Sequence, residues 1–315
     1  MKNNNFMNFE EFKEYCVEHL LLALPEGYED ATINVNTVQK NNGKTLTALT
    51  VLRKDKNVAP NIYLEGFYMD YERGKFLDEI IHEIADILRN SVQQSEEFYN
   101  IVKSFENVNF IKDKVIVELV NREKNAELLN DIPYSIREDL ALIYKVMIEN
   151  REGERATILI HNNHLKNWGI SAEELHEWAV TNTKELLPVK VKSMDNMLEE
   201  FIDFGDMDED EKEYIKGEPE GLLMWVVTNR YNQNGAVSIF FDNVLDKLAE
   251  MFNTDIYILP SSIHEVIVVS SIIKSAEDLA LMVKDINRTE LKPEEILSDH
   301  VYFYGKEEKI FKIAA

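Results

Sequence analysis

The chain has 315 residues, of which 45% are hydrophobic and 29% charged, so it can bury a sizeable core and is not disordered throughout. Asp and Glu number 58 against 34 Lys and Arg, which gives a net charge of −24. So acidic a chain repels phosphate backbones and anionic bilayers, and we expect neither nucleic acid nor a membrane as its partner.

Cysteine content and the amino-terminal segment bear on the compartment. The single cysteine, Cys16, excludes an internal disulfide, and its place on an apolar helical stripe indicates a small buried side chain rather than a catalytic thiol. The segment MKNNNFMNFEEFKEY lacks the apolar core of a signal peptide, and no run approaches the roughly 18 apolar residues of a membrane helix. These features predict a cytoplasmic protein.

The first third of the chain alternates helices with one hairpin. Apolar residues at helical spacing predict helices over 8–24 and 76–90, and shorter ones over 61–73 and 95–105. Strands are expected over 32–39 and 45–52, because Asn42-Gly43 between two alternating segments is a strong hairpin signal.

The middle third combines strands with one firm helix. Apolar runs predict a strand over 115–120 and paired strands over 140–148 and 156–160, and a short helix is expected over 124–129. Ser171 and Glu174 form a capping-box pattern that starts a helix over 171–183.

Residues 221–270 organise the carboxy-terminal third. They predict a strand, an Asn234-Gly235 turn, a strand, a helix, a strand, a turn after Pro260 and a last strand. A helix over 276–287 and two short strands, 301–304 and 310–313, should follow.

Together these elements predict an α+β fold of mixed or antiparallel sheets with packed helices, in two or three sub-domains. We expect an amino-terminal helix, β-hairpin and helices in 1–107, and a strand-pair-and-helix layer in 108–190. An acidic linker that includes DFGDMDEDEKEYIKGEPE should occupy 191–220, and a second α+β layer 221–315.

Three patterns resemble metal sites but are incomplete. His82 is followed at the fourth position by Asp86 where a zinc peptidase helix needs a second histidine. The acidic run that begins at Asp206 lacks the glycine and the final glutamate of a calcium loop, and the three histidines within 161–176 have no regular spacing. The chain also lacks glycine-rich phosphate loops, so we expect no metal and no cofactor.

Polar residues gather at the ends of the predicted carboxy-terminal strands. Ser261, Ser262, His264 and Glu265 follow one strand, and Asn229 ends another. In an extended segment Ser262 and His264 point to the same side, as an activated serine requires, but no G-x-S-x-G elbow surrounds the serine. Turn-forming side chains are the other interpretation. We therefore select these five residues as ligand-binding candidates and select no catalytic residue.

Six stretches resemble one bacterial family, catalogued as domain of unknown function 5688, and the resemblance covers nearly the whole chain. The stretches are NNGKTLTALTVLRKDKNVAPNIYLEGFYMDYERG, LVNREKNAELLNDIPY, NNHLKNWGISAEELHEWAVTNT, MWVVTNRYNQNGAVSIFF, LPSSIHEVIVV and EEILSDHVYFY. The resemblance implies a bacterial, cytoplasmic setting. It transfers no activity, cofactor, substrate or catalytic residue.

These observations favour a non-enzymatic binding or interaction module that holds a protein partner or a small ligand near the five candidate residues. One alternative is a hydrolase that uses a Ser262/His264 pair. A second is an acidic decoy that binds a basic or DNA-binding protein.

Overall fold

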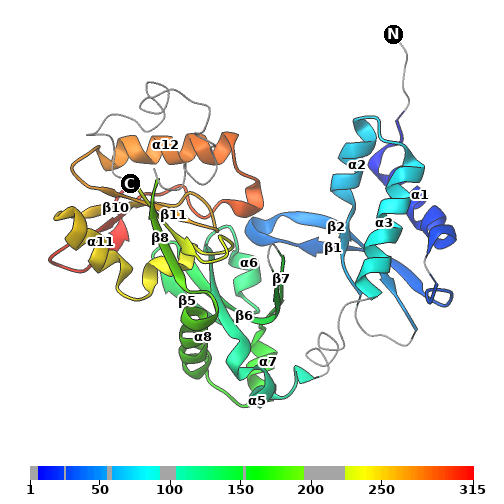
Figure 1. The fold of residues 1–315 in the computed structure, drawn as a ribbon, viewed down its shortest axis with the longest axis horizontal. Coiled ribbons are helices and arrows are strands. Elements are labelled where there is room, and N and C mark those ends of the chain that lie inside the picture. The colour runs from blue at the N-terminus through cyan, green and yellow to red at the C-terminus, as the bar shows by residue number, and fades with distance from the viewer. Residues whose placement is uncertain (1–5, 25, 55–58, 93–103, 152–153, 195–223) are drawn as a thin grey trace, which may run out of the picture. The chain divides into compact units, whose positions relative to one another are not determined.

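The computed structural model describes residues 6–24, 26–54, 59–92, 104–151, 154–194 and 224–315 (Figure 1). Helices and several antiparallel sheets confirm the predicted α+β class. The chain divides into two compact units, Met1–Asn100 and Ile101–Ala315, and each is described by itself. The predicted helix over 95–105 and the acidic run after residue 203 lie mostly or wholly outside the described residues.

The amino-terminal unit is a three-stranded sheet covered by helices on one face (Figure 1). The hairpin strands pair from Thr32↔Leu52 to Gln39↔Thr45, as predicted, and both Asn42 and Gly43 have positive φ. The elements are α1 (Phe9–Ala23), β1 (Thr32–Gln39), β2 (Thr45–Leu52), β3 (Ile62–Tyr63), α2 (Leu64–Glu72) and α3 (Leu77–Val92), with sheet order β1-β2-β3.

Cys16 lies in the core of this unit and is fully buried, together with Phe12 and Leu20 of the same helix. Burial raises the pKa of its thiol to about 12. The prediction that Cys16 is a buried side chain is confirmed, and its raised pKa shows that the thiol is not activated as a nucleophile.

The second unit begins with a small antiparallel sheet. Strand β6 is paired with β4 on one side and with β5 and β7 on the other. Helix α8 covers the free edge of β4, where Thr183 Oγ1 accepts a 3.0 Å hydrogen bond from the Val117 amide. The elements are α5 (Val108–Ile111), β4 (Val115–Asn121), α6 (Ala126–Leu129), β5 (Tyr134–Arg137), β6 (Leu140–Arg151), β7 (Glu154–Leu159), α7 (Asn162–Trp168) and α8 (Ala172–Leu186).

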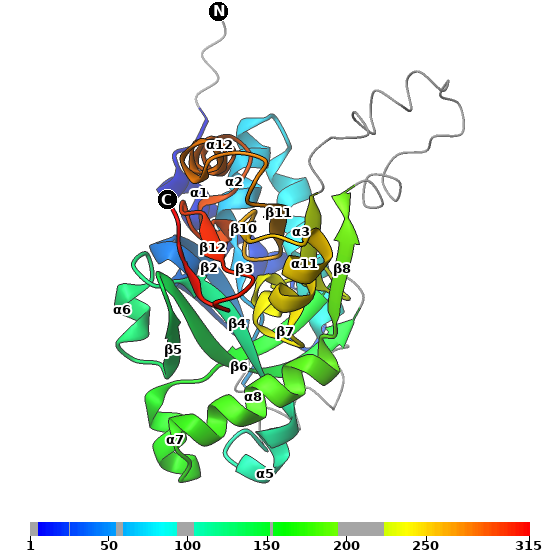
Figure 2. The ribbon, with the colours of Figure 1, turned by 90° about the vertical axis from the view of Figure 1, so that its left-hand side faces the viewer.

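A larger antiparallel sheet of order β13-β12-β10-β11-β9-β8 completes this unit (Figures 1 and 2). Helix α12 packs on one of its faces, and α11 with a short 3-10 helix packs on the other. The elements are β8 (Val189–Ser193), β9 (Trp225–Asn229), the 3-10 helix η4 (Ala236–Phe240), α11 (Val244–Phe252), β10 (Ile256–Leu259), β11 (Val266–Ser270), α12 (Ala276–Thr289), β12 (Tyr302–Tyr304) and β13 (Phe311–Ile313).

One hydrophobic core joins the two sheets of the second unit. Val117 of β4 and Tyr144 of β6 belong to the same buried cluster as Val227 of β9 and Val268 of β11. The predicted layers 108–190 and 221–315 therefore share their core, and whether they act as separate sub-domains stays a prediction.

The strand predicted after Asn234-Gly235 is wrong. Residues Ala236–Phe240 form η4, and β9 pairs with β8 and β11 instead of forming a hairpin across this turn. Gly235 has φ −90°, so its backbone conformation does not require glycine. Glycine is needed because there is no room for a side chain: an added Cβ would lie 2.3 Å from Thr228 Oγ1 and 2.5 Å from the Asn229 amide nitrogen. Strands β3, β5 and β8 were not predicted from the sequence, and β3 lies in the stretch 61–73 that was expected to be a short helix.

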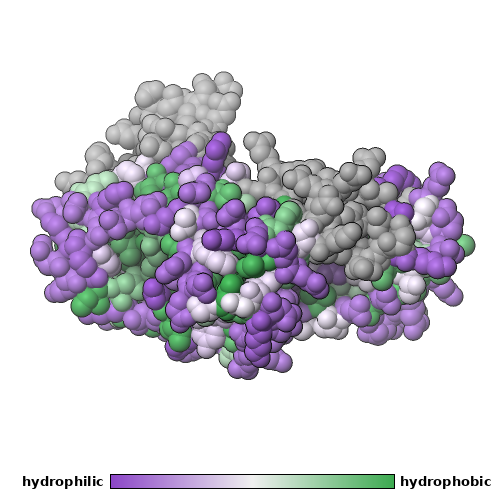
Figure 3. All heavy atoms as spheres, turned by 90° about the horizontal axis from the view of Figure 1, so that it is seen from below, coloured by the Kyte–Doolittle hydropathy of each residue, from purple (hydrophilic) through white to green (hydrophobic). Residues whose placement is uncertain are grey.

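Hydrophilic side chains dominate the face drawn in Figure 3, and apolar ones form small islands. Among the described helices, none is long and apolar enough to cross a membrane.

Candidate functional site

The fold brings the five predicted site residues to one corner of the larger sheet. Asn229 ends β9, and the link from β10 to β11 carries Ser261, Ser262, His264 and Glu265. Because β9 and β11 pair antiparallel, with Val266 opposite Val227, the end of one strand lies beside the start of the other.

Two of these side chains shape the turns themselves. Asn229 is 1% exposed; its Oδ1 accepts from the Tyr231 amide at 2.9 Å and its Nδ2 donates to the Gln233 carbonyl at 2.7 Å. Ser262 is 6% exposed, and its Oγ accepts from the His264 amide at 3.0 Å. Both form the local side-chain-to-backbone bonds that fix turns, whereas Ser261 is half-buried.

His264 connects the corner to the loop after β9. Its Nδ1 accepts a 3.1 Å hydrogen bond from the Asn234 amide, so the proton of the neutral ring is on Nε2. Its carbonyl accepts from Gly235 N at 2.9 Å and from Thr228 Oγ1 at 2.8 Å. The described hydrogen bonds of Ser262 and His264 thus do not join the hydroxyl to the imidazole, as an activated serine would require.

Glu265 is half-buried at the same corner. Burial raises its pKa, and the opposing effects of His264 and Lys190 are smaller. Lys190 lies on β8 opposite Thr228, and its Nζ donates to Asn232 Oδ1 at 3.3 Å. The corner therefore favours a neutral Glu265 over a wider pH range than usual.

A second polar group, which the sequence analysis did not select, lies on the small sheet. Register places Glu118 of β4, Lys145 of β6 and Arg155 of β7 on one sheet face, because side chains alternate along each strand. Glu118 is 4% exposed, and its Oε2 forms a 2.5 Å ion pair with Lys145 Nζ. Burial raises the pKa of Glu118, but Lys145, Asn234 and Arg155 together outweigh it, so the net pKa is lowered.

Arg155 is only partly used by its neighbours. Its Nη1 donates to the Gln233 carbonyl at 3.2 Å, and its guanidinium lies 6.0 Å from the Tyr231 ring centroid. Burial lowers the pKa of Arg155, against the effects of Glu118 and Tyr231. Buried Nε and Nη2 of Arg155 and buried Oε1 of Glu118 have no hydrogen-bond partner in the described part of the chain.

The loop of residues 230–235 joins these two polar groups. The Gln233 carbonyl accepts from both Asn229 Nδ2 and Arg155 Nη1. Asn234 bonds His264 through its amide, and its side chain lies against the Glu118 carboxylate. We call residues 231–235 of this loop, the corner 261–265 and the three charged residues Glu118, Lys145 and Arg155 the loop site.

A third polar cluster is closed. The Asp139 carboxylate, 5% exposed, accepts from Ser298 Oγ at 2.7 Å, Tyr302 OH at 2.7 Å and His300 Nδ1 at 3.0 Å. The Ser298 hydroxyl and the His300 imidazole both bond the carboxylate, and Ser298 Oγ accepts from the backbone amide of His300 rather than bonding its ring, so this is not a catalytic triad. It connects the turn before β6 to the segment before β12.

The histidines of the incomplete metal patterns form ordinary hydrogen bonds with nearby protein groups. His82 Nδ1 lies 2.6 Å from the Asp78 carbonyl of its own helix, and His176 Nδ1 lies 2.9 Å from the Tyr144 hydroxyl. His161 and His164 are neighbours at the start of α7, where His161 bonds Asp131 at 2.7 Å. Within the described ranges, no group of three or more His, Cys, Asp or Glu side chains could hold a metal.

Comparison with known proteins identifies one relationship. A family model described as a family of unknown function (DUF5688) matches residues 9–306, which include every residue of the loop site. No curated protein and no solved structure matches the chain.

Proposed function

Because the chain belongs to DUF5688, a family of unknown function, we propose its function from its own residues: it is a non-enzymatic module that binds a small polar ligand at the loop site. The ligand presents acceptor oxygens to Arg155 and a donor to Glu118. Hydrogen phosphate and small hydroxycarboxylates have this chemistry.

The proposal rests on three buried polar atoms, Nε and Nη2 of Arg155 and Oε1 of Glu118, that have no hydrogen-bond partner among the described residues. A buried polar atom without a partner costs about 1–3 kcal/mol, and more when it is charged, so an empty site of this kind is unfavourable. Nε and Nη2 form the edge of a guanidinium that matches two oxygens of a carboxylate or phosphate.

The local charge supports an anionic ligand. The whole chain carries −24, yet the loop site combines the cations Lys145 and Arg155 with the carboxylates Glu118 and Glu265, and Lys190 of β8 lies beside it. Lys145 is occupied by Glu118, and the raised pKa of Glu265 favours its neutral form. Arg155 therefore keeps its positive charge, and its Nε and Nη2 groups, which have no partner among the described residues, are available to a ligand.

A catalytic role has less support at this site. Ser262 and Asn229 are held by backbone amides of their own turns, and the imidazole Nδ1 of His264 accepts from the Asn234 amide rather than from a serine hydroxyl. We expect a fluorophosphonate probe to leave Ser262 unlabelled, and labelling of Ser262 would favour the hydrolase instead.

Inorganic phosphate is the first probe, measured by calorimetry and by thermal unfolding of the full chain at constant ionic strength. We expect phosphate to bind and to raise the unfolding temperature of the wild type and of Arg230→Gln, a matched control because Arg230 is exposed on the same loop. Arg155→Gln should abolish the effect. Arg155→Lys, which keeps the charge but loses the guanidinium edge, should bind about tenfold more weakly.

Equal responses in the wild type and Arg155→Gln would refute the proposal, as would no response in the wild type to phosphate. A crystal structure grown with phosphate that holds only an ordered water between Glu118 and Arg155 would also refute it.

A further inference from the structure

Strand β1 has one unused edge. It is the first strand in the order β1-β2-β3, and no described strand pairs with its outer side. An unpaired edge exposes a row of backbone donors and acceptors that can add another strand.

The backbone groups on that edge follow from the hairpin. Lys40 N donates to Lys44 O, so this pair is hydrogen-bonded and the even-numbered residues of β1 face β2. The odd-numbered pair Thr37↔Thr47 is not hydrogen-bonded between the two strands, as this pattern requires. Its Thr47 N–H points away from β1 and donates to Glu65 Oε1 at 2.6 Å. The groups that point outward are therefore those of Ile33, Val35, Thr37 and Gln39.

The edge carries none of the usual protections. Natural edge strands are blocked by charged side chains, proline or a bulge. The sequence of β1, TINVNTVQ, has no charge and no proline, and its register with β2 is continuous over all eight residues. The chain is 29% charged, and a strand of eight uncharged residues lets two acidic copies approach without like charges facing each other along its length.

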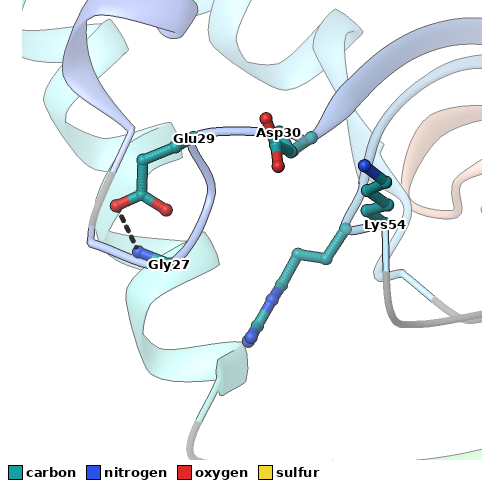
Figure 4. A pocket seen from close by; sticks show the side chains of 6 residues that line it. Gly27, Glu29, Asp30 and Lys54 are labelled. Atoms are coloured by element: carbon teal, nitrogen blue, oxygen red, sulfur yellow. Dashed lines mark hydrogen bonds between the residues drawn. The ribbon is translucent and has the colours of Figure 1, made fainter.

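Charges at the two ends of β1 are complementary in an antiparallel self-pairing. Exposed Glu29 and Asp30 precede the strand, with Arg53 and Lys54 beside them at the end of β2. The turn that follows the strand carries exposed Lys44 and half-buried Lys40, whose Nζ lies 4.0 Å from the Tyr63 ring centroid. Figure 4 shows Glu29 folded back on the Gly27 amide, with Asp30 and Lys54 near the start of the strand, in a pocket of about 310 Å³. A two-fold axis at Asn36 brings the lysines of each copy toward the carboxylates of the other.

We propose that two copies of the full chain form a dimer by antiparallel addition of β1 to β1, which extends two three-stranded sheets into one of six strands. In the register centred on Asn36, Val35 of one copy lies opposite Thr37 of the other, and Ile33 opposite Gln39. These are the residues with outward-facing backbone groups, so each copy supplies both donors and acceptors.

The experiment is sedimentation of the full chain over a concentration series, with circular dichroism to verify folding. We expect a dimer for the wild type and for Val35→Thr, which keeps the outward N–H. We expect a monomer for Val35→Pro, which removes that N–H but no bond to β2, and for Thr37→Lys, which places a charge on the edge. Lys44→Glu should weaken the dimer at low salt, and Asp30→Lys in the same chain should restore it.

A wild type that stays monomeric at every concentration would overturn the proposal. So would a dimer that persists in folded Thr37→Lys and Val35→Pro, because another surface would then make the contact. Loss of the dimer in Val35→Thr would overturn it too, since side chains rather than backbone groups would then hold the copies together. Phosphate binding at the loop site is independent of each outcome.

Discussion

Gly235→Ala tests the close packing on which the loop site depends. An added Cβ would lie 2.3 Å from Thr228 Oγ1, 2.5 Å from the Asn229 amide nitrogen and 2.8 Å from the His264 carbonyl oxygen. Two of these atoms belong to the backbone and cannot rotate away. The methyl group must therefore separate the loop from the corner and disturb the bonds that Gly235 and Thr228 donate to the His264 carbonyl.

Overpacking typically costs about 1–3 kcal/mol, and each lost hydrogen bond adds about 1 kcal/mol. We therefore expect Gly235→Ala to destabilise the second unit by about 3 kcal/mol or more. The matched control is Gly66→Ala, because nothing lies within 4 Å of a Cβ on that helical residue. It should stabilise the first unit by about 0.5–1 kcal/mol.

A chain of two units does not unfold in a single two-state step, so hydrogen exchange by mass spectrometry is the suitable assay. In Gly235→Ala we expect faster exchange in peptides that cover 225–270, with peptides from 9–52 unchanged as the internal reference. Exchange of 225–270 at the wild-type rate would show that the loop accommodates a methyl group and that the described close approach is wrong.

Three further changes have predicted directions. Glu118→Gln should lower the free energy of unfolding by about 3–5 kcal/mol at neutral pH, because it leaves Lys145 without its buried partner. The folded pKa of Glu118 is lowered, so the stabilisation by the ionised carboxylate is present above the usual glutamate pKa and is lost as the pH falls through the folded pKa. Urea denaturation of the wild type and Glu118→Gln at several pH values would measure the loss and its pH dependence. Burial raises the pKa of Glu265, so the wild type should lose stability as the pH rises above about 4.3, where the carboxyl ionises in the unfolded chain. Glu265→Gln should remove that loss. Identical stability–pH profiles of the wild type and Glu265→Gln would contradict the raised pKa. Asp139→Asn should lower the free energy of unfolding by about 3 kcal/mol, because the Tyr302, Ser298 and His300 side chains then share a weaker acceptor. Tyr302→Phe, which removes one donor, should cost less. An Asp139→Asn variant as stable as the wild type would show that these hydrogen bonds do not hold the cluster together.

The two Asn-Gly pairs show what local sequence can predict. At Asn42-Gly43 both residues have positive φ and join adjacent strands, as the dipeptide indicates. At Asn234-Gly235 the glycine has φ −90° and is needed because a distant segment lies against it. The Asn-Gly dipeptide therefore predicts a turn that requires positive φ, but it does not predict a glycine that is required because another part of the chain packs against it.

The candidate site divides in the same way. The strand ends predicted a common corner for Asn229 and His264, which the pairing of β9 with β11 provides. Glu118, Lys145 and Arg155 come from another sheet, and no local pattern indicates which strands meet. A signal was nevertheless present, because Glu118 in VIVELV and Lys145 in LALIYKVMI are single charges inside apolar strands, and a buried charge needs a partner.

The proposed ligand binds the Nε and Nη2 donors of Arg155, which have no partner among the described residues. Nitrogen-15 NMR of the arginine Nε–H groups, recorded while inorganic phosphate is added to the full chain, tests this binding most directly. We predict that the Arg155 Nε–H signal shifts in a saturable manner while the Arg230 signal does not. An Arg155 signal that stays unchanged at saturating phosphate, or that moves together with Arg230, would contradict the account.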